Sequence, residues 1–300
     1  MGILGIALTA TGTLGATTLG YTLLEAQAFT TRNYDLAVLK PGSADLRVLH
    51  LSDLHLTPSQ TRKISWLQSL EALEPDLVVV TGDMLSHQLS VPAVAEALGG
   101  LLNRPGMFVL GSNDYFSPAH KNPLRYLRRK RAIVNNSPKL PTQDLIDLLC
   151  EHGWLDLNNK QDVVTINGVR IHARGTNDPH IKLDDYAAVA GPYDADALAL
   201  GVTHAPYLRV LEQFNSDNTE LLLAGHTHGG QICIPFYGAI VTNCDLPTKQ
   251  AKGVSEFTSN GHSMPMHVSA GVGTNPYTPI RLACRPEATL LTLKAANSTS

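Results

Sequence analysis

The chain has 300 residues, of which 43% are apolar and 16% are charged, and its formal net charge is -3. This composition allows a core of ordinary size and excludes a largely disordered chain. The balance of charge also excludes a global attraction to nucleic acid, whereas twelve histidines are an unusual number for residues that serve metal binding and proton transfer.

The N-terminal segment over residues 3–24 carries no charged side chain and is rich in Gly, Ala and Thr. As a helix it would be about 33 Å long, enough to cross a bilayer core. We therefore predict a single-pass transmembrane anchor in the cell membrane within residues 1–28 and a polar linker over residues 29–44. The alternative is a cleaved signal peptide, because Ala26-Gln27-Ala28 resembles a cleavage site. Arg32 and Lys40 favour a cytoplasmic catalytic domain, but the side of the membrane stays open.

Five short apolar runs follow, and each leads into Gly or a polar residue, as buried strands do. These runs cover residues 46–51, 77–80, 107–110, 198–202 and 221–224. Amphipathic stretches between the first three, around Trp66 and Val94, predict a β-α-β-α-β order and a largely parallel sheet.

Later segments predict a second sheet. An Asn167-Gly168 turn between two apolar runs indicates a hairpin, and residues 231–234, 266–270 and 289–293 are further strand candidates. We expect one domain over residues 45–296, with two sheets packed face to face and helices outside.

Each of the five runs ends in side chains that bind metals. These candidate ligands are Asp53, His55, Asp83, Asn113, His204, His226 and His228. Sites in open α/β sheets form at the carboxyl ends of strands, so these side chains are expected to converge. In an extended chain, residues two apart, such as Asp53 and His55, would point the same way. Carboxylate and imidazole ligands favour manganese, iron or zinc over calcium, and two such ions can clamp a phosphate and activate water.

The ordered set of motifs resembles the calcineurin-like metallophosphoesterase superfamily, in its membrane-associated bacterial branch. The motifs are Asp53-Leu54-His55, Gly82-Asp83, Gly111-Ser112-Asn113-Asp114, Thr203-His204 and Gly225-His226-Thr227-His228, with Pro279-Ile280-Arg281-Leu282 and Arg285-Pro286-Glu287 near the end. The resemblance implies a four-layer α/β/β/α sandwich and two divalent metal ions. One ion would be held by Asp53, His55, Asp83 and His228. Asp83 would bridge to the second ion, held with an Asn, His204 and His226.

The third motif departs from the family pattern, which has Gly-Asn-His followed by Asp or Glu. Without a gap, Ser112 replaces the ligand Asn; with a shift of one residue, Asn113 is the ligand. We favour Asn113, because an amide oxygen is a better neutral ligand than a hydroxyl. Either way the usual histidine that assists the leaving group is missing, and Asp114 or His180 are candidate substitutes.

Two further features leave alternatives open. Cys150, Cys233, Cys244 and Cys284 include no CxxC pair, so we expect free thiols, or one bridge if the domain is exported. The basic cluster Arg125, Arg128, Arg129, Lys130 and Arg131, flanked by Lys121 and Lys139, is either a solvated helix face or a patch for anionic headgroups or substrate phosphates.

The resulting hypothesis is a metal-dependent phosphoric ester hydrolase. It would cleave a mono-, di- or pyrophosphate bond, with metal-bridging hydroxide as the nucleophile and a substrate that is membrane-associated, for example lipid-linked. Asp83, Asn113, Asp114 and His204 are its candidate catalytic residues, and no nucleic-acid partner is expected. The alternatives are a catalytically weakened metal-binding membrane scaffold, favoured by the altered third motif, and a nuclease of the same superfamily.

Overall fold

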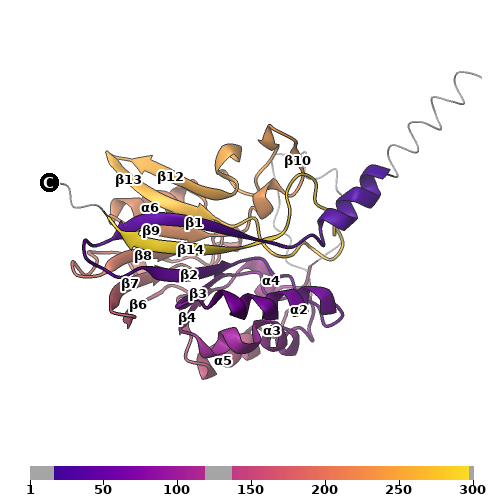
Figure 1. The fold of residues 1–300 in the computed structure, drawn as a ribbon, viewed down its shortest axis with the longest axis horizontal. Helices are drawn as coiled ribbons and strands as arrows, with labels where there is room; N and C mark the ends of the chain where they lie inside the picture. Colours follow the sequence, from indigo (N-terminus) through magenta and orange to yellow (C-terminus); the bar gives the residue numbers. More distant parts are fainter. Residues whose placement is uncertain (1–16, 119–136, 297–300) are drawn as a thin grey trace, which may run out of the picture.

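A computed structural model describes residues 17–118 and 137–296 (Figure 1). Its strands form two six-stranded sheets and a small two-stranded one, in the orders β1-β14-β2-β3-β4-β5, β12-β13-β9-β8-β7-β6 and β10-β11. The strands are β1 (Thr30–Leu39), β2 (Leu46–Leu51), β3 (Leu77–Thr81), β4 (Gly106–Val109), β5 (Leu155–Asp156), β6 (Lys160–Ile166), β7 (Val169–Gly175), β8 (Leu198–Val202), β9 (Leu221–Ala224), β10 (Cys233–Ile234), β11 (Gly238–Ala239), β12 (Gly253–Ser259), β13 (His262–Val268) and β14 (Glu287–Ala295).

Helices cover the outer faces of the two large sheets. The α-helices are α2 (Thr61–Ser69), α3 (Val91–Leu98), α4 (Ser112–Tyr115), α5 (Thr142–Glu151) and α6 (Leu208–Ser216). Short 3₁₀ turns are η1 (Leu70–Leu73), η2 (Gly99–Asn103), η4 (Pro179–Ile181), η5 (Tyr186–Ala188), η6 (His228–Gly230) and η7 (Thr248–Gln250). Figure 1 shows α2, α3 and α5 on the side of β2, β3 and β4, and α6 on the side of β9 and β13.

Three apolar clusters explain why the layers pack in this order. One lies between the first sheet and α2, α3 and α5, a second lies between the two sheets, and a third lies under α6. Along β2, Leu49 and Leu51 enter the first cluster, whereas Leu46 and Val48 enter the second, as the alternation of a strand requires. The predicted pair of mixed sheets with flanking helices is therefore confirmed.

The predicted β-α-β-α-β order is also confirmed. β2, β3 and β4 pair in parallel, with α2 and α3 in the connections. The hairpin of β6 and β7 turns at Asn167 and Gly168, which both have positive φ, as a tight hairpin turn requires.

The segment expected to be a linker is a strand over most of its length. β1 pairs in parallel with β14 at the edge of the first sheet. Tyr34, Leu36 and Val38 alternate along β1 and pack on the cluster between the sheets. This period of two identifies a half-buried strand, and it was obscured by the polar residues on the other face.

The N-terminal prediction is only partly covered by the described residues. Residues 17–25 are helical, and residues 1–16 of the predicted anchor lie outside the described range. Among the helices of residues 17–118 and 137–296, none is long and apolar enough to cross a membrane.

Candidate metal centre

The seven candidate ligands meet where the carboxyl ends of both large sheets come together. Asp53 and His55 follow β2, Asp83 follows β3, and Asn113 lies in α4 just after β4. His204 follows β8, and His226 and His228 follow β9. Four of these residues, Asp53, His55, Asp83 and His204, are at most 3% exposed, so the centre lies largely below the surface.

The backbone of the centre is not extended, contrary to the expectation for residues two apart. Asp53, His55, Asp83, His226 and His228 all have φ between 43° and 68°. Non-glycine residues rarely adopt this left-handed region, and such residues gather at functional sites. The side chains therefore converge because the backbone turns sharply at each ligand.

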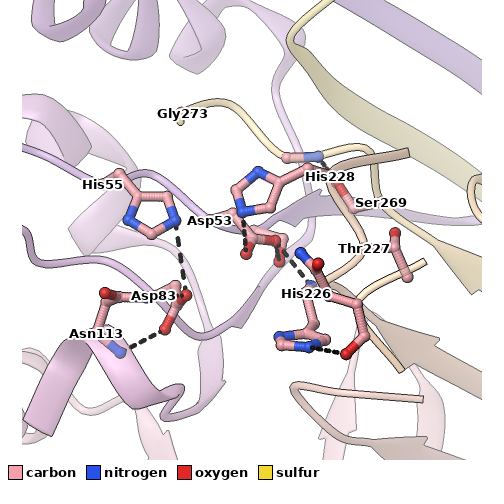
Figure 2. Close-up of polar contacts among 12 residues, drawn as sticks. Asp53, His55, Asp83, Asn113, His226, Thr227, His228, Ser269 and Gly273 are labelled. Atoms are coloured by element: carbon pink, nitrogen blue, oxygen red, sulfur yellow. Dashed lines mark hydrogen bonds and ion pairs between the residues drawn. The ribbon is translucent and has the colours of Figure 1, made fainter. Parts of the chain in front are cut away.

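Two carboxylates lie at the middle of the centre (Figure 2). Asp83 Oδ2 is 3.5 Å from His55 Nε2 and 3.7 Å from His204 Nε2. Asp53 Oδ1 is 3.5 Å from His228 Nε2. Ligand atoms about 2.1 Å from a shared ion lie about 3–3.5 Å apart, so this spacing is close to that of atoms around a common metal.

Two overlapping groups of side chains offer ligand atoms close enough for one ion each. The first is Asp53, His55 and His228, and the second is Asp53, Asp83 and His204. Asp53 belongs to both groups, and Asp83 is the residue that lies between His55 and His204. The geometry therefore offers two carboxylates that could face both ions.

Unpaired buried atoms also fit a metal. Within the described ranges, Asp53 Oδ1 and His55 Nε2 are buried without a hydrogen-bond partner. Buried polar atoms in folded proteins are nearly always paired, so such atoms need a partner of another kind. A divalent cation is one that suits both a carboxylate oxygen and an imidazole nitrogen.

The tautomers of two histidines point to the same conclusion. His204 Nδ1 donates to the carbonyl of Thr81 at 2.7 Å, so Nε2 is the nitrogen turned toward Asp83. His226 Nε2 faces the carbonyl of Asn243 at 3.4 Å, which leaves Nδ1 as a lone pair. These two nitrogens lie 3.3 Å apart, so a proton on His204 can be shared with His226, and a bound cation would take the place of that proton.

Charges around His204 act in the same direction. Burial lowers its pKa, but Asp83, then Asp178 and Asp53, outweigh burial and raise the pKa to about 9. The site thus has enough negative charge to attract a positive ion to this nitrogen.

The third strand end places Asn113 against Asp83. The Asn113 backbone N–H donates to Asp83 Oδ1 at 2.7 Å, and its Nδ2 donates to Asp83 Oδ2 at 2.6 Å. Asp114 instead accepts backbone N–H bonds from Gly111, Asp83, Met84 and Leu85. Burial, followed by repulsion from Asp83, raises the pKa of Asp114 to about 7. Asp114 therefore ties the loop after β3 to the loop after β4.

His180, the other candidate substitute, lies beside the centre. Its ring centroid is 4.6 Å from that of His226, and its Nδ1 is 3.0 Å from the Tyr207 hydroxyl. Of the basic cluster, residues 121–131 lie outside the described residues, and only Lys139 is described.

Several residues that support the ligands were not identified from the sequence. Ser52 Oγ donates to Asp53 Oδ2 at 2.6 Å, and Ser86 Oγ lies 3.1 Å from His55 Nδ1. A Cβ on Gly111 would lie 2.3 Å from Asp83 Oδ1, so a side chain at this position would displace the Asp83 carboxylate. The buried Arg281 guanidinium donates to the carbonyls of Gly271 and Gly273 and is 3.4 Å from that of His228. Gly111 and Arg281 carried a signal, since both lie in the quoted motifs, and Ser52 adjoins a ligand, whereas nothing in the sequence marked Ser86.

Residues 46–230 match the model of the calcineurin-like phosphoesterase family. The chain belongs to this family. It is therefore a phosphoric ester hydrolase, and the dimetal dependence of the family agrees with the two groups of ligands. The four cysteines are free, as expected.

Similar proteins span nearly the whole chain. YpbG of Bacillus subtilis is 27% identical, with 89% of this chain and 92% of that protein covered. The "Transmembrane protein with metallophosphoesterase domain" of Bos taurus is 29% identical, with 90% of this chain and 57% of that protein covered. Phosphodiesterase YaeI of Escherichia coli is 25% identical, with 86% of each chain covered.

Proposed function

We propose that this protein hydrolyses a phosphoester of a membrane-associated substrate, for example a lipid-linked one, at two divalent ions held by the seven candidate ligands. The observation that carries the proposal is the convergence of buried imidazole nitrogens on two carboxylates, those of Asp53 and Asp83. His55 Nε2 and His204 Nε2, 3.5 Å and 3.7 Å from Asp83 Oδ2, are the clearest pair. Manganese, iron or zinc suits this mixture of carboxylate, imidazole and amide.

The bound ions would neutralise the phosphate and lower the pKa of a water molecule. The chain itself fixes the ligands. Thr81 holds His204 in one tautomer, Ser52 turns Asp53, and Asn113 holds Asp83. Asp83, between His55 and His204, is our candidate for the bridging carboxylate.

His180 is our candidate for the proton donor to the leaving group, in place of the histidine missing from the third motif. Its ring packs at a tilt against that of His226 and contacts the Tyr207 hydroxyl, so it is held at the edge of the centre. The Asp114 carboxylate is already engaged with backbone N–H groups. His180→Gln should slow hydrolysis of phenyl esters more than of p-nitrophenyl esters, because the poorer leaving group depends more on protonation. Equal slowing of both esters would remove His180 from this role.

Membrane association is supported by the uncharged segment over residues 3–24 and by the names of the vertebrate relatives, which are transmembrane proteins with a metallophosphoesterase domain. An anchor in this segment would keep the protein in the membrane fraction after a high-salt wash. Release by salt would argue against it.

The test of the hydrolase is metal-dependent cleavage of bis(p-nitrophenyl) phosphate by metal-stripped protein supplied with manganese, iron or zinc. His226→Ala should remove the metal-dependent rate, and His152→Ala, at an exposed histidine after α5, is the matched control. An unchanged rate in His226→Ala would overturn the dimetal mechanism.

A further inference from the structure

An apolar rim lies beside the metal centre. We use this name for the exposed apolar side chains of three neighbouring segments, which are Leu19, Tyr21, Leu23 and Leu24 of the helix over residues 17–25, Ile232, Ile234, Phe236, Tyr237, Ile240 and Val241 of the hairpin around β10 and β11, and Tyr277. Phe236, at the turn, is fully exposed, and Tyr237 is 76% exposed. Exposed apolar side chains that gather on neighbouring segments are unfavourable in water and mark a surface that another phase or molecule covers.

Hydrogen bonds tie the three segments together. Arg281 N donates to the carbonyl of Thr22, and the buried Glu25 carboxylate accepts from Ala283 N and Cys284 N. The same loop joins the hairpin, because Cys233 N donates to the Leu282 carbonyl. In Figure 1 the helix and the hairpin lie at the same end of the molecule, opposite the C-terminus.

The hairpin begins and ends at the metal centre. It leaves at η6, which contains His228, and it returns at Asn243, whose carbonyl faces His226 Nε2 at 3.4 Å. Whatever covers the apolar rim therefore lies next to the centre.

The lack of charge identifies a bilayer as the occupant. Residues 221–244 contain no Asp, Glu, Lys or Arg, and residues 3–24, which run into the helix of the rim, contain none either. A protein partner would usually be met by a polar border, whereas aromatic and aliphatic side chains without charges suit the boundary of a membrane.

We infer that the β10–β11 hairpin inserts its tip into the lipid bilayer and sets the metal centre against the membrane surface. The substrate class that follows is a phosphoester whose apolar part stays in the bilayer while its phosphate reaches the centre. The inference rests on the proposed function for the reaction, but the membrane contact can be tested without it.

The contact is tested with the full chain in vesicles of phosphatidylcholine and phosphatidylglycerol that carry brominated acyl chains. Phe236→Trp should give emission that is blue-shifted and quenched by bromine, after subtraction of the wild-type signal from Trp66 and Trp154. Leu89→Trp, at a largely exposed site between β3 and α3, is the control and should show neither change. Quenching of Phe236→Trp no greater than that of Leu89→Trp would overturn the inference. A blue shift of the Phe236→Trp emission without vesicles would also overturn it, because self-association of the protein would then be what shields the hairpin.

A rate measurement tests the consequence for the substrate. The double variant Phe236→Ser/Tyr237→Ser should lose turnover of phosphatidic acid in vesicles and keep the wild-type rate on soluble bis(p-nitrophenyl) phosphate. An equal loss of rate on both substrates would mean that the hairpin stabilises the metal centre and does not contact the membrane. If the wild type cleaved neither substrate while the quenching remained, the proposed function would fail and the membrane contact would stand.

Discussion

Two groups of buried histidines in this molecule behave in opposite ways. His50 of β2 and His267 of β13 face each other between the two sheets, with Nδ1 atoms 2.8 Å apart, and His50 Nε2 pairs with the Thr81 hydroxyl at 2.9 Å. Burial lowers the pKa of both rings of this pair. His204 and His226 also face each other, but there Asp83, Asp178 and Asp53 outweigh burial and raise the pKa of His204 to about 9.

The difference shows that burial of a histidine does not decide its role. The pair between the sheets is buried, so a charge on it is unfavourable, whereas His204 lies against the Asp83 carboxylate, where a cation is favourable. The charge of the neighbouring side chains makes the distinction. Four experiments test this distinction between the two groups of histidines.

The largest effect is expected at Asp83, which belongs to the strand-end group. Asp83→Asn removes one negative charge from between His55 and His204, and kcat/KM should fall at least about 10³-fold, or about 4 kcal/mol. The measurement is metal-dependent phosphodiester hydrolysis together with bound metal per chain. Asp35→Asn, at an exposed carboxylate of β1, is the control and should keep the wild-type values. A fully active Asp83→Asn would contradict the assignment.

The next effect is steric. Gly111 has φ of -112°, so its backbone accepts alanine, but the new Cβ would lie 2.3 Å from Asp83 Oδ1 and 2.7 Å from His204 Cε1. Gly111→Ala should lower turnover about 100-fold, because displacements of about 1 Å in a site have effects of this size. Gly20→Ala, where the new Cβ meets no atom within 4 Å, is the control. Normal turnover in Gly111→Ala would show that the ligands tolerate displacement.

The third experiment separates the two groups by their response to metal. Manganese at about 100 times its dissociation constant should raise the free energy of unfolding of the wild type by about 2.7 kcal/mol. His50→Leu/His267→Leu should start less stable by about 1–3 kcal/mol, since the Thr81 hydroxyl loses its partner, yet gain the same increment. His226→Ala should gain less. Loss of the increment in the double variant would place the inter-sheet pair in the metal site.

The fourth experiment measures the pH dependence of stability. Burial, and then His267, lowers the pKa of His50, and burial lowers the pKa of His267 to about 3. Below pH ~6.5 the two histidines bind protons in the unfolded chain but stay neutral in the folded protein. The free energy of unfolding therefore falls as the pH falls toward 3, by up to about 1.4 kcal/mol per pH unit for each group. Urea denaturation of metal-free protein from pH 7 to pH 4 should show a shallower fall in His50→Leu/His267→Leu. Parallel curves would mean that the pair does not titrate in this way.

Much of the fold could be predicted from local patterns. Runs such as Leu77–Val80 are long enough and apolar enough to identify buried strands, and the Asn167-Gly168 turn fixed one hairpin. β1 was missed because its apolar residues, Tyr34, Leu36 and Val38, are interrupted by polar ones that face outward at the sheet edge.

The sequence by itself determined which residue types end the strands, because a short apolar run followed by Asp, Asn or His is a local pattern. It also determined that residues 3–24 and 221–244 carry no charge. Only the tertiary structure decided which atoms meet. The left-handed turns at Asp53 and His226, the pairing of His50 with His267 across 217 positions, and the exposure of Phe236 beside the metal centre all depend on how distant segments pack. No local pattern encodes the partner of a buried nitrogen, and that partner separates the histidines of the core from those of the candidate metal site.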